Sequence, residues 1–344
     1  MMNNPLPLLR TIGLEAGYGR GRKKVSPVPG PLDLALHAGQ LVCLLGPNGS
    51  GKSTLLRTLA GLQPALKGSI EITGAGAGKL KPAQLARKIS LVLTDPVRYS
   101  NLEVWSLVAL GRYPYTGWMG KLSDADKAIV AWAIGATGIE ALLNRKIATL
   151  SDGESQKVML ARALAQDTPL MMLDEPTAHL DLPSRIQLMQ LLHQLVKRTN
   201  KGVLISTHEL DLALQVADEV WLLQAGGQLS KGAPEDLVLN GIFETVFDKE
   251  GILFDKTTGT FNMHQGSGKK ITLTGEGAPV FWTKRALMRQ GFTVAPPSSP
   301  LNEQQPTADH VRISEKDGRT IWVLEQDGKT GQYDSVESLL DALK

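Results

Sequence analysis

The sequence predicts an α/β fold in which a largely parallel sheet is covered by helices on both faces. Continuous apolar runs, typical of strands buried on both sides, alternate with segments of helical periodicity. The runs are QLVCLL (40–45), KISLVL (88–93), PLMMLD (169–174), GVLIS (202–206) and EVWLLQ (219–224). Two N-terminal segments, LEAGYG and GPLDLAL, are more typical of an antiparallel edge. Helix formers between Leu102 and Gln166 predict a helical insertion.

The character of the sequence changes after about Lys249. A strand over KKITLT, a helix over VFWTKRALMRQ, a hairpin at Asp317-Gly318 and a final helix predict a small α+β unit there. A chain of 344 residues is long for one domain. We therefore expect a larger domain over residues 1–249, with its helical part at about 95–166, and a smaller one over residues 250–344.

Composition and charge exclude several classes of protein. Hydrophobic residues make up 42% of the chain and charged residues 21%, as in a globular protein with a large core. The net charge of +3 is too small for an electrostatic nucleic-acid binder, so we expect no nucleic-acid partner. The one cysteine, Cys43, lies in an apolar strand, which predicts a buried thiol and a reducing compartment. No apolar run reaches the ~18 residues of a membrane span, so membrane association is expected only through a partner.

The segment GPNGSGKST, from Gly46 to Thr54, matches the phosphate-binding pattern G-x-x-x-x-G-K-[ST] between an apolar strand and a helix. Its glycines let successive backbone N–H groups point at phosphate oxygens beside a helix N-terminus. Lys52 is expected to reach the β- and γ-phosphates, and Ser53 to hold Mg²⁺. The nucleotide-binding residues predicted here are Gly46, Asn48, Gly49, Ser50, Gly51, Lys52, Ser53 and Thr54.

Two adjacent carboxylates, Asp174 and Glu175, end the apolar strand LMMLDEP. In a parallel sheet this position is the carboxyl edge, where ligands of α/β proteins bind. Asp174 suits the Mg²⁺ shell, directly or through water. Glu175 suits a general base that polarises the attacking water.

Five motifs occur in the order and spacing of the ATP-binding-cassette (ABC) ATPases, which this sequence resembles over roughly residues 8–240. They are the phosphate loop, LSDGE (150–154), LDEP (173–176), HLD (179–181) and STHEL (206–210). The resemblance implies a P-loop NTPase that binds and hydrolyses ATP with Mg²⁺. It also implies that Tyr18 stacks on adenine, that His208 contacts the γ-phosphate in catalysis, and that Asp181 communicates between two subunits.

The LSDGE segment has two possible roles, helix capping and phosphate binding. Ser151 and Glu154 have the spacing of a helix capping box. The resemblance implies a homodimer in which Ser151 and the Gly153 N–H bind the γ-phosphate of ATP held by the other subunit. Asp152 and Glu154 stand where the family usually has glycine and glutamine. Because acidic groups repel phosphate, we expect these two departures to tune activity without abolishing it.

A third departure lies at the end of the strand ISLVLT, where the family usually carries a glutamine that touches Mg²⁺ and the attacking water. Thr94 stands at this position. We expect its hydroxyl to take the metal-binding role through an extra water, with Asp95 as the other candidate.

The segment LVALGRYPYTGW (107–118) resembles the ALGRYP segment of ATPases that serve importers of iron–siderophore complexes, haem and vitamin B12. This resemblance implies polytopic permease subunits, a substrate-binding protein, and a position on the cytoplasmic face of the inner membrane. Packing alone is the other explanation of the motif.

The main alternative function is a soluble cassette ATPase acting on nucleic acid or ribosomes, and a third is a nucleotide-binding regulator that barely hydrolyses ATP. Residues 250–344 carry no recognised motif and are expected to regulate activity or stabilise the dimer.

Overall fold

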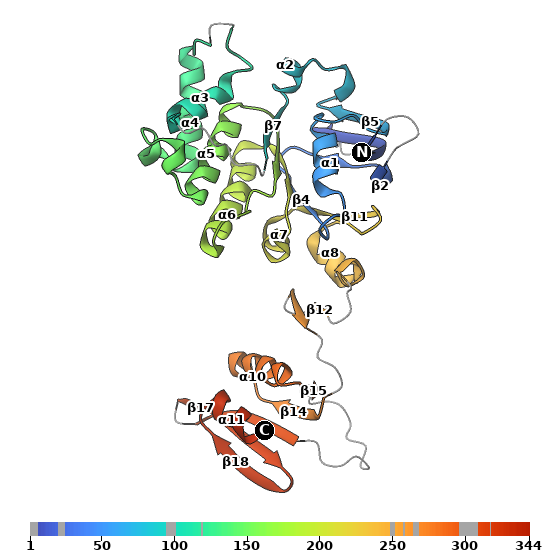
Figure 1. Ribbon diagram of the computed structural model, residues 1–344, viewed down its shortest axis with the longest axis vertical. Helices are drawn as coiled ribbons and strands as arrows, with labels where there is room; N and C mark the ends of the chain where they lie inside the picture. The colour runs from blue at the N-terminus through green and yellow to red at the C-terminus, as the bar shows by residue number, and fades with distance from the viewer. Residues whose placement is uncertain are drawn as a thin grey trace, which may run out of the picture. The chain divides into compact units, whose positions relative to one another are not determined.

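The computed structural model divides the chain into two compact units (Figure 1). Unit 1 comprises Met1–Asp248 with Phe254–Thr260, and unit 2 comprises Lys249–Leu253 with Phe261–Lys344. The residues described are 6–19, 25–93, 101–117, 120–247, 252–256, 259–263, 268–295, 309–316 and 318–344. Within these ranges no helix has the length and apolar character needed to cross a membrane.

Unit 1 is built on a mostly parallel sheet with the strand order β11-β10-β4-β9-β8-β7. The strands are β4 (Leu41–Leu45), β7 (Ile89–Val92), β8 (Leu170–Asp174), β9 (Gly202–Ser206), β10 (Glu219–Leu223) and the antiparallel β11 (Leu229–Gly232). Every residue of β4, β8 and β9 is buried, so both faces of the sheet are covered. The predicted α/β architecture is thus confirmed. Burial raises the pKa of the Cys43 thiol in β4 to about 12, which keeps this side chain protonated and unreactive.

An antiparallel sheet with the order β2-β1-β5-β6 lies beside the parallel one, as the N-terminal segments predict. Its strands are β1 (Leu9–Tyr18), β2 (Val25–Leu32), β5 (Lys67–Ile72) and β6 (Ala75–Gly76), and the short β3 (Ala35–Leu36) pairs with β1. One apolar cluster joins both sheets to helix α1 (Lys52–Leu59), through residues such as Leu9, Leu44 and Leu55. This shared core fixes the start of α1 at the carboxyl edge of β4.

Three helices form the predicted insertion, on the side of the parallel sheet away from β1, β2 and β5 (Figure 1). They are α3 (Val104–Ala109), α4 (Asp124–Thr137) and α5 (Asp152–Ala165). A capping box of Ser123 and Asp126 begins α4, and Gly138, with a positive φ, ends it. The remaining helices of unit 1 are α2 (Pro82–Leu85), α6 (Leu182–Thr199), α7 (Leu210–Val216), α8 (Pro234–Leu239) and α9 (Ile242–Phe247).

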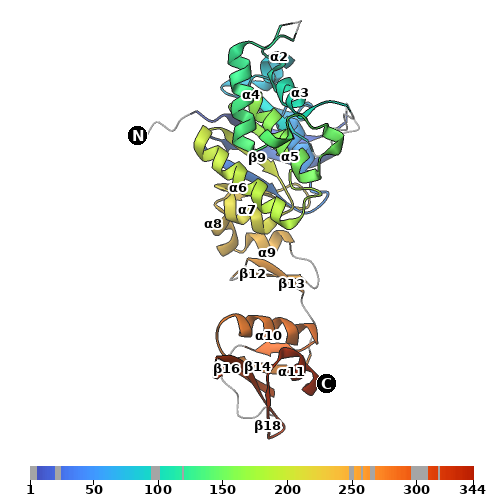
Figure 2. The same cartoon turned by 90° about the vertical axis from the view of Figure 1, so that its left-hand side faces the viewer.

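The described part of unit 2 contains a mixed sheet with the order β15-β14-β16-β17-β18 and two helices (Figure 2). Its elements are β14 (Lys270–Thr274), α10 (Gly277–Arg289), β15 (Thr293–Ala295), β16 (Asp309–Lys316), β17 (Arg319–Gln326), β18 (Lys329–Tyr333) and α11 (Val336–Ala342). Leu287 of α10 and Leu339 of α11 share one core with the strands. The Trp322 indole N–H donates to the buried Thr283 hydroxyl at 2.7 Å, which satisfies the polar atom of the largest side chain in this core. In the sequence between β11 and β14, β12 (Ile252–Asp255) pairs with β13 (Thr260–Met263).

Candidate functional site

The phosphate loop joins β4 to α1 with a backbone that only glycine adopts easily. Gly46 has φ +152° and Gly51 has φ +102°. A Cβ on Gly46 would lie 2.2 Å from the Leu223 carbonyl oxygen, and one on Gly51 would lie 2.6 Å from Val28 Cγ2. The loop is therefore packed tightly against β10 and β2, while Asn48 and Gly49 at its tip are exposed.

Two polar side chains inside the loop fit a bound triphosphate. Lys52 is 6% exposed, and its Nζ donates to the carbonyl oxygens of Gly46 at 2.8 Å and Pro47 at 3.1 Å. Burial lowers the pKa of Lys52, opposed by the charges of Glu175 and then Asp174. The buried Ser50 Oγ meets no hydrogen-bond partner among the described residues. A buried cation and an unsatisfied hydroxyl beside a row of backbone N–H groups are what a phosphate chain requires.

The oxygen groups suited to Mg²⁺ come together at the carboxyl ends of β8 and β9. Ser53 Oγ donates to Asp174 Oδ1 at 3.2 Å, and the Ser206 hydroxyl donates to the same carboxylate oxygen. Hard oxygen ligands of this kind, completed by phosphate oxygens and water, match the preference of Mg²⁺. Thr94, the third predicted metal-site residue, lies outside the described residues.

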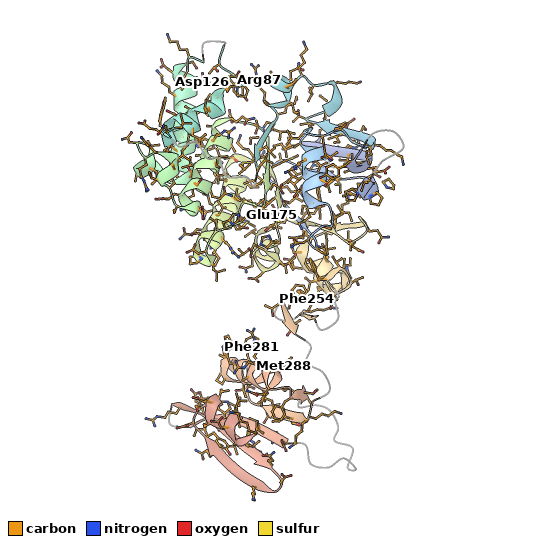
Figure 3. The ribbon with its side chains drawn as sticks, viewed as in Figure 1. Arg87, Asp126, Glu175, Phe254, Phe281 and Met288 are labelled. Carbon is orange, nitrogen blue, oxygen red and sulfur yellow. The ribbon has the colours of Figure 1, made fainter. Side chains whose placement is uncertain are left out.

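Glu175 follows Asp174 at the same edge, where Figure 3 labels it. Its backbone is left-handed, with φ +47°, and its N–H donates to the Ser206 carbonyl oxygen at 2.9 Å. This conformation costs a non-glycine residue about 1–3 kcal/mol, which the surrounding strands must offset. His208 Nδ1 lies 3.8 Å from Glu175 Oε2, and His208 Nε2 lies 3.4 Å from Glu209 Oε1. The imidazole is therefore flanked by two carboxylates, one of them the predicted base.

Tyr18 lies at the end of β1, next to the first turn of α1. Its hydroxyl and the Thr54 hydroxyl share a hydrogen bond of 2.6 Å. The residue is still 49% exposed, because it ends the strand. Its ring is thus held beside the phosphate loop and remains accessible to a nucleotide base.

Ser151 and Gly153 line a separate small cavity of about 160 Å³ at the start of α5. Its lining residues are Ser151, Gly153, Glu154, Gln156, Lys157, Leu180, Ser184 and Leu188. None of these belongs to the phosphate loop, so one chain does not bring the two halves of the predicted site together. Asp181 lies next to this cavity as the N-cap of α6, and its hydrogen bonds with Ser184, first with the side chain and then with the backbone N–H, lower the pKa of its carboxyl.

The capping role of Ser151 and Glu154 is confirmed. Glu154 Oε2 accepts from the Ser151 N–H at 2.8 Å, and Ser151 Oγ accepts from the Glu154 N–H at 3.3 Å. Arg145 Nη1 pairs with Glu154 Oε1 at 2.9 Å. The backbone hydrogen bond from Ser151 is the main cause of the lowered pKa of Glu154. The Glu154 carboxylate therefore points back to Ser151 at the start of α5, and the positive charge of Arg145 compensates it.

Asp152 has no such compensation, since it is exposed in the first turn of α5. We expect Asp152→Gly to tighten ATP binding about 2- to 5-fold, because a carboxylate near a phosphate site is removed. Titration of a fluorescent ATP analogue into the full-length protein measures this. Asp124→Gly, at the matching position of α4, is the control for the change in helix propensity. Unchanged affinity and turnover in Asp152→Gly would make the residue merely permissive.

The GRYP segment has a packing part and an exposed part. Arg112 Nε donates to Asp126 Oδ1 at 2.8 Å, and its Nη1 donates to the Ala165 carbonyl oxygen at 3.0 Å. Its guanidinium lies 4.0 Å from the centre of the Tyr115 ring. Tyr113, in contrast, is 74% exposed. Packing thus explains Arg112 and Tyr115, whereas Tyr113 remains available to a partner.

Arg112→Ala is expected to lower the free energy of unfolding by about 3–5 kcal/mol, since it leaves the buried Asp126 carboxylate unpaired. Urea denaturation followed by circular dichroism measures the loss. Arg87→Ala is the control, because Arg87 is exposed and lies over the same Tyr115 ring at 5.2 Å. We expect it to cost no more than about 1 kcal/mol. Equal losses in the two variants would contradict the buried ion pair as the cause.

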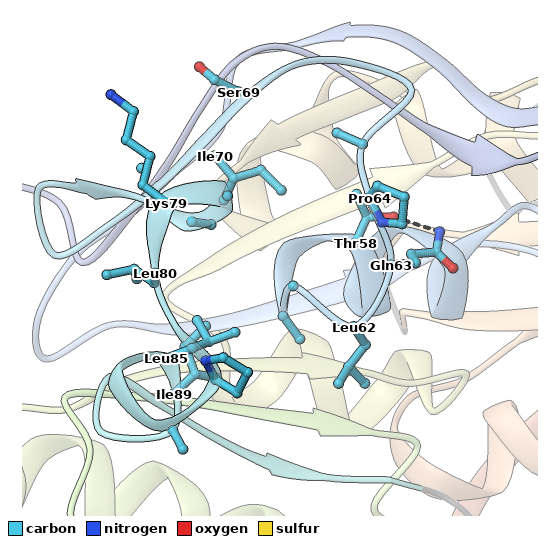
Figure 4. A pocket seen from close by; sticks show the side chains of 18 of the residues that line it. Thr58, Leu62, Gln63, Pro64, Ser69, Ile70, Lys79, Leu80, Leu85 and Ile89 are labelled. Atoms are coloured by element: carbon cyan, nitrogen blue, oxygen red, sulfur yellow. Dashed lines mark hydrogen bonds between the residues drawn. The ribbon is translucent and has the colours of Figure 1, made fainter. Parts of the chain in front are cut away.

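A larger cavity of about 980 Å³ opens beside the end of α1 and was not predicted (Figure 4). Its lining is mostly apolar, and includes Leu62, Ile70, Leu80, Leu85 and Ile89. These side chains come from the loop after α1, from β5, from α2 and the turn before it, and from β7, so no contiguous sequence signal marks the cavity.

Together, the fold and the phosphate loop define a nucleotide-hydrolysing P-loop protein. The family model described as ABC transporter matches residues 30–178, and the model described as iron ABC transporter C-terminal domain matches residues 268–344. The ABC transporter ATP-binding protein MJ0873 of Methanocaldococcus jannaschii, itself uncharacterised, is 35% identical over 83% of this chain and 98% of its own length. The achromobactin transport ATP-binding protein CbrD of Dickeya dadantii is 36% identical over 63% of this chain and 81% of its own. The iron(3+)-hydroxamate import protein FhuC of Bacillus subtilis is 33% identical over 63% and 80%.

Solved structures of ABC cassettes superpose on this chain. The dimeric MJ0796 cassette bound to ADP and Pi superposes with a TM-score of 0.57 at 26% identity, over 66% of this chain and 98% of that one. The cbiO1 protein of Clostridium perfringens gives 0.60 at 25% identity, over 70% and 94%. The chain belongs to the ABC transporter family and is an ATP-binding subunit that hydrolyses ATP to drive transport. Such subunits dimerise and work with membrane permeases, which favours transport over the nucleic-acid or ribosome alternative.

Proposed function

We propose that the chain powers an importer of iron–siderophore, haem or cobalamin-type substrates. The observation that carries this proposal is the match of residues 268–344 to an iron-transporter C-terminal domain. Relatives named for achromobactin, iron(3+)-hydroxamate and cobalamin transport support it. In this proposal the chain acts at the cytoplasmic face of the inner membrane, with a permease and a substrate-binding protein as partners.

The phosphate chain of ATP would lie along the loop from Gly46 to Thr54. Lys52 would exchange its two carbonyl acceptors for phosphate oxygens, and Ser50 Oγ would gain a partner. Ser53 and Asp174 would hold Mg²⁺. The Thr94 hydroxyl would contribute to the same metal site through an extra water. When bound, Mg²⁺ neutralises charge on the phosphates. Tyr18 would stack on the adenine.

Glu175 is the proposed general base. Its carboxylate would accept a proton from the water that attacks the γ-phosphate, while His208 beside it would hold that phosphate. The fixed backbone of Glu175 orients the carboxylate before the reaction, which saves the cost of arranging it in the transition state.

Two copies of the chain would complete each site. Ser151 and the Gly153 N–H of one copy would bind the γ-phosphate held by Lys52 of the other, with Asp181 at the contact between copies. ATP must then favour the closed dimer over the open one, since equal affinity for both would shift nothing. We further propose that residues 250–344 form the second domain, which regulates activity or stabilises this dimer.

Purification from detergent extracts tests the transport proposal. A tagged chain is expected to retain a polytopic membrane protein, and the preparation is expected to hydrolyse ATP. Sedimentation with ribosomes, with no membrane protein retained, would instead support the soluble alternative.

A further inference from the structure

The strand end that carries Tyr18 is irregular. The register of β1 on β2 shifts between Ala16 and Tyr18, because two β2 residues, Ser26 and Pro27, lie opposite Gly17 in a β-bulge. A Cβ on Gly17 would lie 2.3 Å from the Val25 carbonyl oxygen, so the backbone closes in here and no larger residue fits. A bulge interrupts the ladder of backbone hydrogen bonds, and the position of Tyr18 therefore depends on other contacts.

Gln63, in the loop after α1, supplies such contacts. Its Nε2 donates to Thr58 Oγ1 at 2.7 Å, to the Thr54 carbonyl oxygen at 3.3 Å and to the Gly17 carbonyl oxygen at 3.4 Å. The amide has two hydrogens, so the two longer contacts share one of them. One side chain thus ties the β1 backbone opposite the bulge to the buried polar face of α1.

The network continues along the same face of α1, where Thr54 and Thr58 are one turn apart. Thr58 Oγ1 donates to the Thr54 carbonyl oxygen at 2.7 Å, and the Thr54 hydroxyl bonds the Tyr18 hydroxyl at 2.6 Å. Thr54 is 6% exposed and Thr58 is fully buried. Figure 4 shows Gln63 at the wall of the large cavity, with its amide directed at Thr58. Gln63 is therefore outside the phosphate loop but two hydrogen bonds from the aromatic side chain.

We propose that Gln63 is a positioning residue that fixes Tyr18 against the adenine base. This rests on the proposed stacking role of Tyr18. The network restrains both ends of the residue: Gln63 holds the backbone before Tyr18, and Thr54 holds its hydroxyl. Gln63 contacts the phosphate loop only at the carbonyl oxygen of its last residue, Thr54, so we expect its loss to affect recognition of the base far more than the phosphate site.

The test compares two ligands on the full-length protein, MgATP and magnesium tripolyphosphate, by isothermal titration calorimetry. Gln63→Leu is expected to weaken ATP binding about 3- to 10-fold and to leave tripolyphosphate binding unchanged. Tyr18→Ala is expected to show the same selectivity more strongly, and adding Gln63→Leu to it is expected to have no further effect. Gln166→Leu is the matched control, because Gln166 also lines the cavity but donates to the Ala86 and Ile89 carbonyl oxygens.

Four results would overturn the inference. Equal weakening of both ligands by Gln63→Leu would indicate general disturbance of the loop, and so would an equal effect of Gln166→Leu. If Tyr18→Ala weakens the binding of ATP but not of tripolyphosphate, and Gln63→Leu does not, the adenine role of Tyr18 stands and the role of Gln63 is refuted. No selectivity in Tyr18→Ala would refute the stacking role itself. Should Gln63→Leu fail to fold, Thr58→Val removes the shortest of the three contacts and is expected to be selective as well.

Discussion

Replacing Glu175 with glutamine is expected to lower ATP turnover at least about 100-fold while ATP still binds, because a general base contributes that much or more. The amide has the shape of the carboxylate but cannot accept the proton of the attacking water. The backbone hydrogen bond to Ser206 and the left-handed φ of Glu175 do not depend on the side-chain charge, so the site stays folded. Unhydrolysed ATP should then hold two copies together.

Two readouts follow this change: phosphate release, and dimer mass by light scattering with and without ATP. Glu219→Gln is the control, because this carboxylate accepts from Trp221 of β10 and from Gln40, which precedes β4, away from the phosphates. Turnover within about threefold of wild type in Glu175→Gln would remove this residue from the role of base. Loss of turnover without an ATP-dependent dimer would argue against the two-copy site.

Replacing Lys52 with methionine is expected to weaken ATP binding about 100-fold, because two charge-assisted contacts to phosphate are lost. The fold should not suffer. Burial lowers the pKa of Lys52, so the folded protein holds this charge at a cost that methionine removes. The expected pattern is therefore lost affinity with equal or higher thermal stability.

Lys201→Met separates the two effects. This lysine is also largely buried, but it pairs with Asp167 and donates to the Thr168 carbonyl oxygen. Its loss should lower the melting temperature and leave ATP affinity unchanged. Calorimetry of binding and of unfolding on both variants measures the contrast. Equal affinity losses would mean that the role of Lys52 is structural.

The sequence predicts the features that short contiguous segments determine. Apolar runs of five residues predict the buried parallel strands, since both faces of such strands are covered. Ser151 and Glu154 predict their own capping box, because the two side chains lie within one helical turn. The phosphate loop with Lys52 is likewise local, and Asp174 follows from where its strand ends.

The features that were missed depend on residues far apart in the chain. Gln63 reaches Gly17 and Thr54 only because β1 and α1 share a core. The large cavity is assembled from α1, β5, β6, α2, β7 and the loops between them, over residues 58–91, with Gln166 added. Arg112 looked like part of a partner surface, but its contact with Asp126 is set by the packing of α3 and its following turn against α4. The left-handed backbone of Glu175 has no signal in sequence, since glutamate rarely adopts it.

In the proposed mechanism, each ATP site needs Lys52 of one copy and Ser151 of another. The ATPase rate of a mixture of two inactive proteins, Lys52→Met and Ser151→Arg, shows whether the two residues act across copies. A mixed dimer has one intact pair, so roughly a quarter of wild-type turnover is expected at equal concentrations, with neither protein active alone. A mixture as inactive as its components would contradict the two-copy site, and so would full activity of Ser151→Arg by itself.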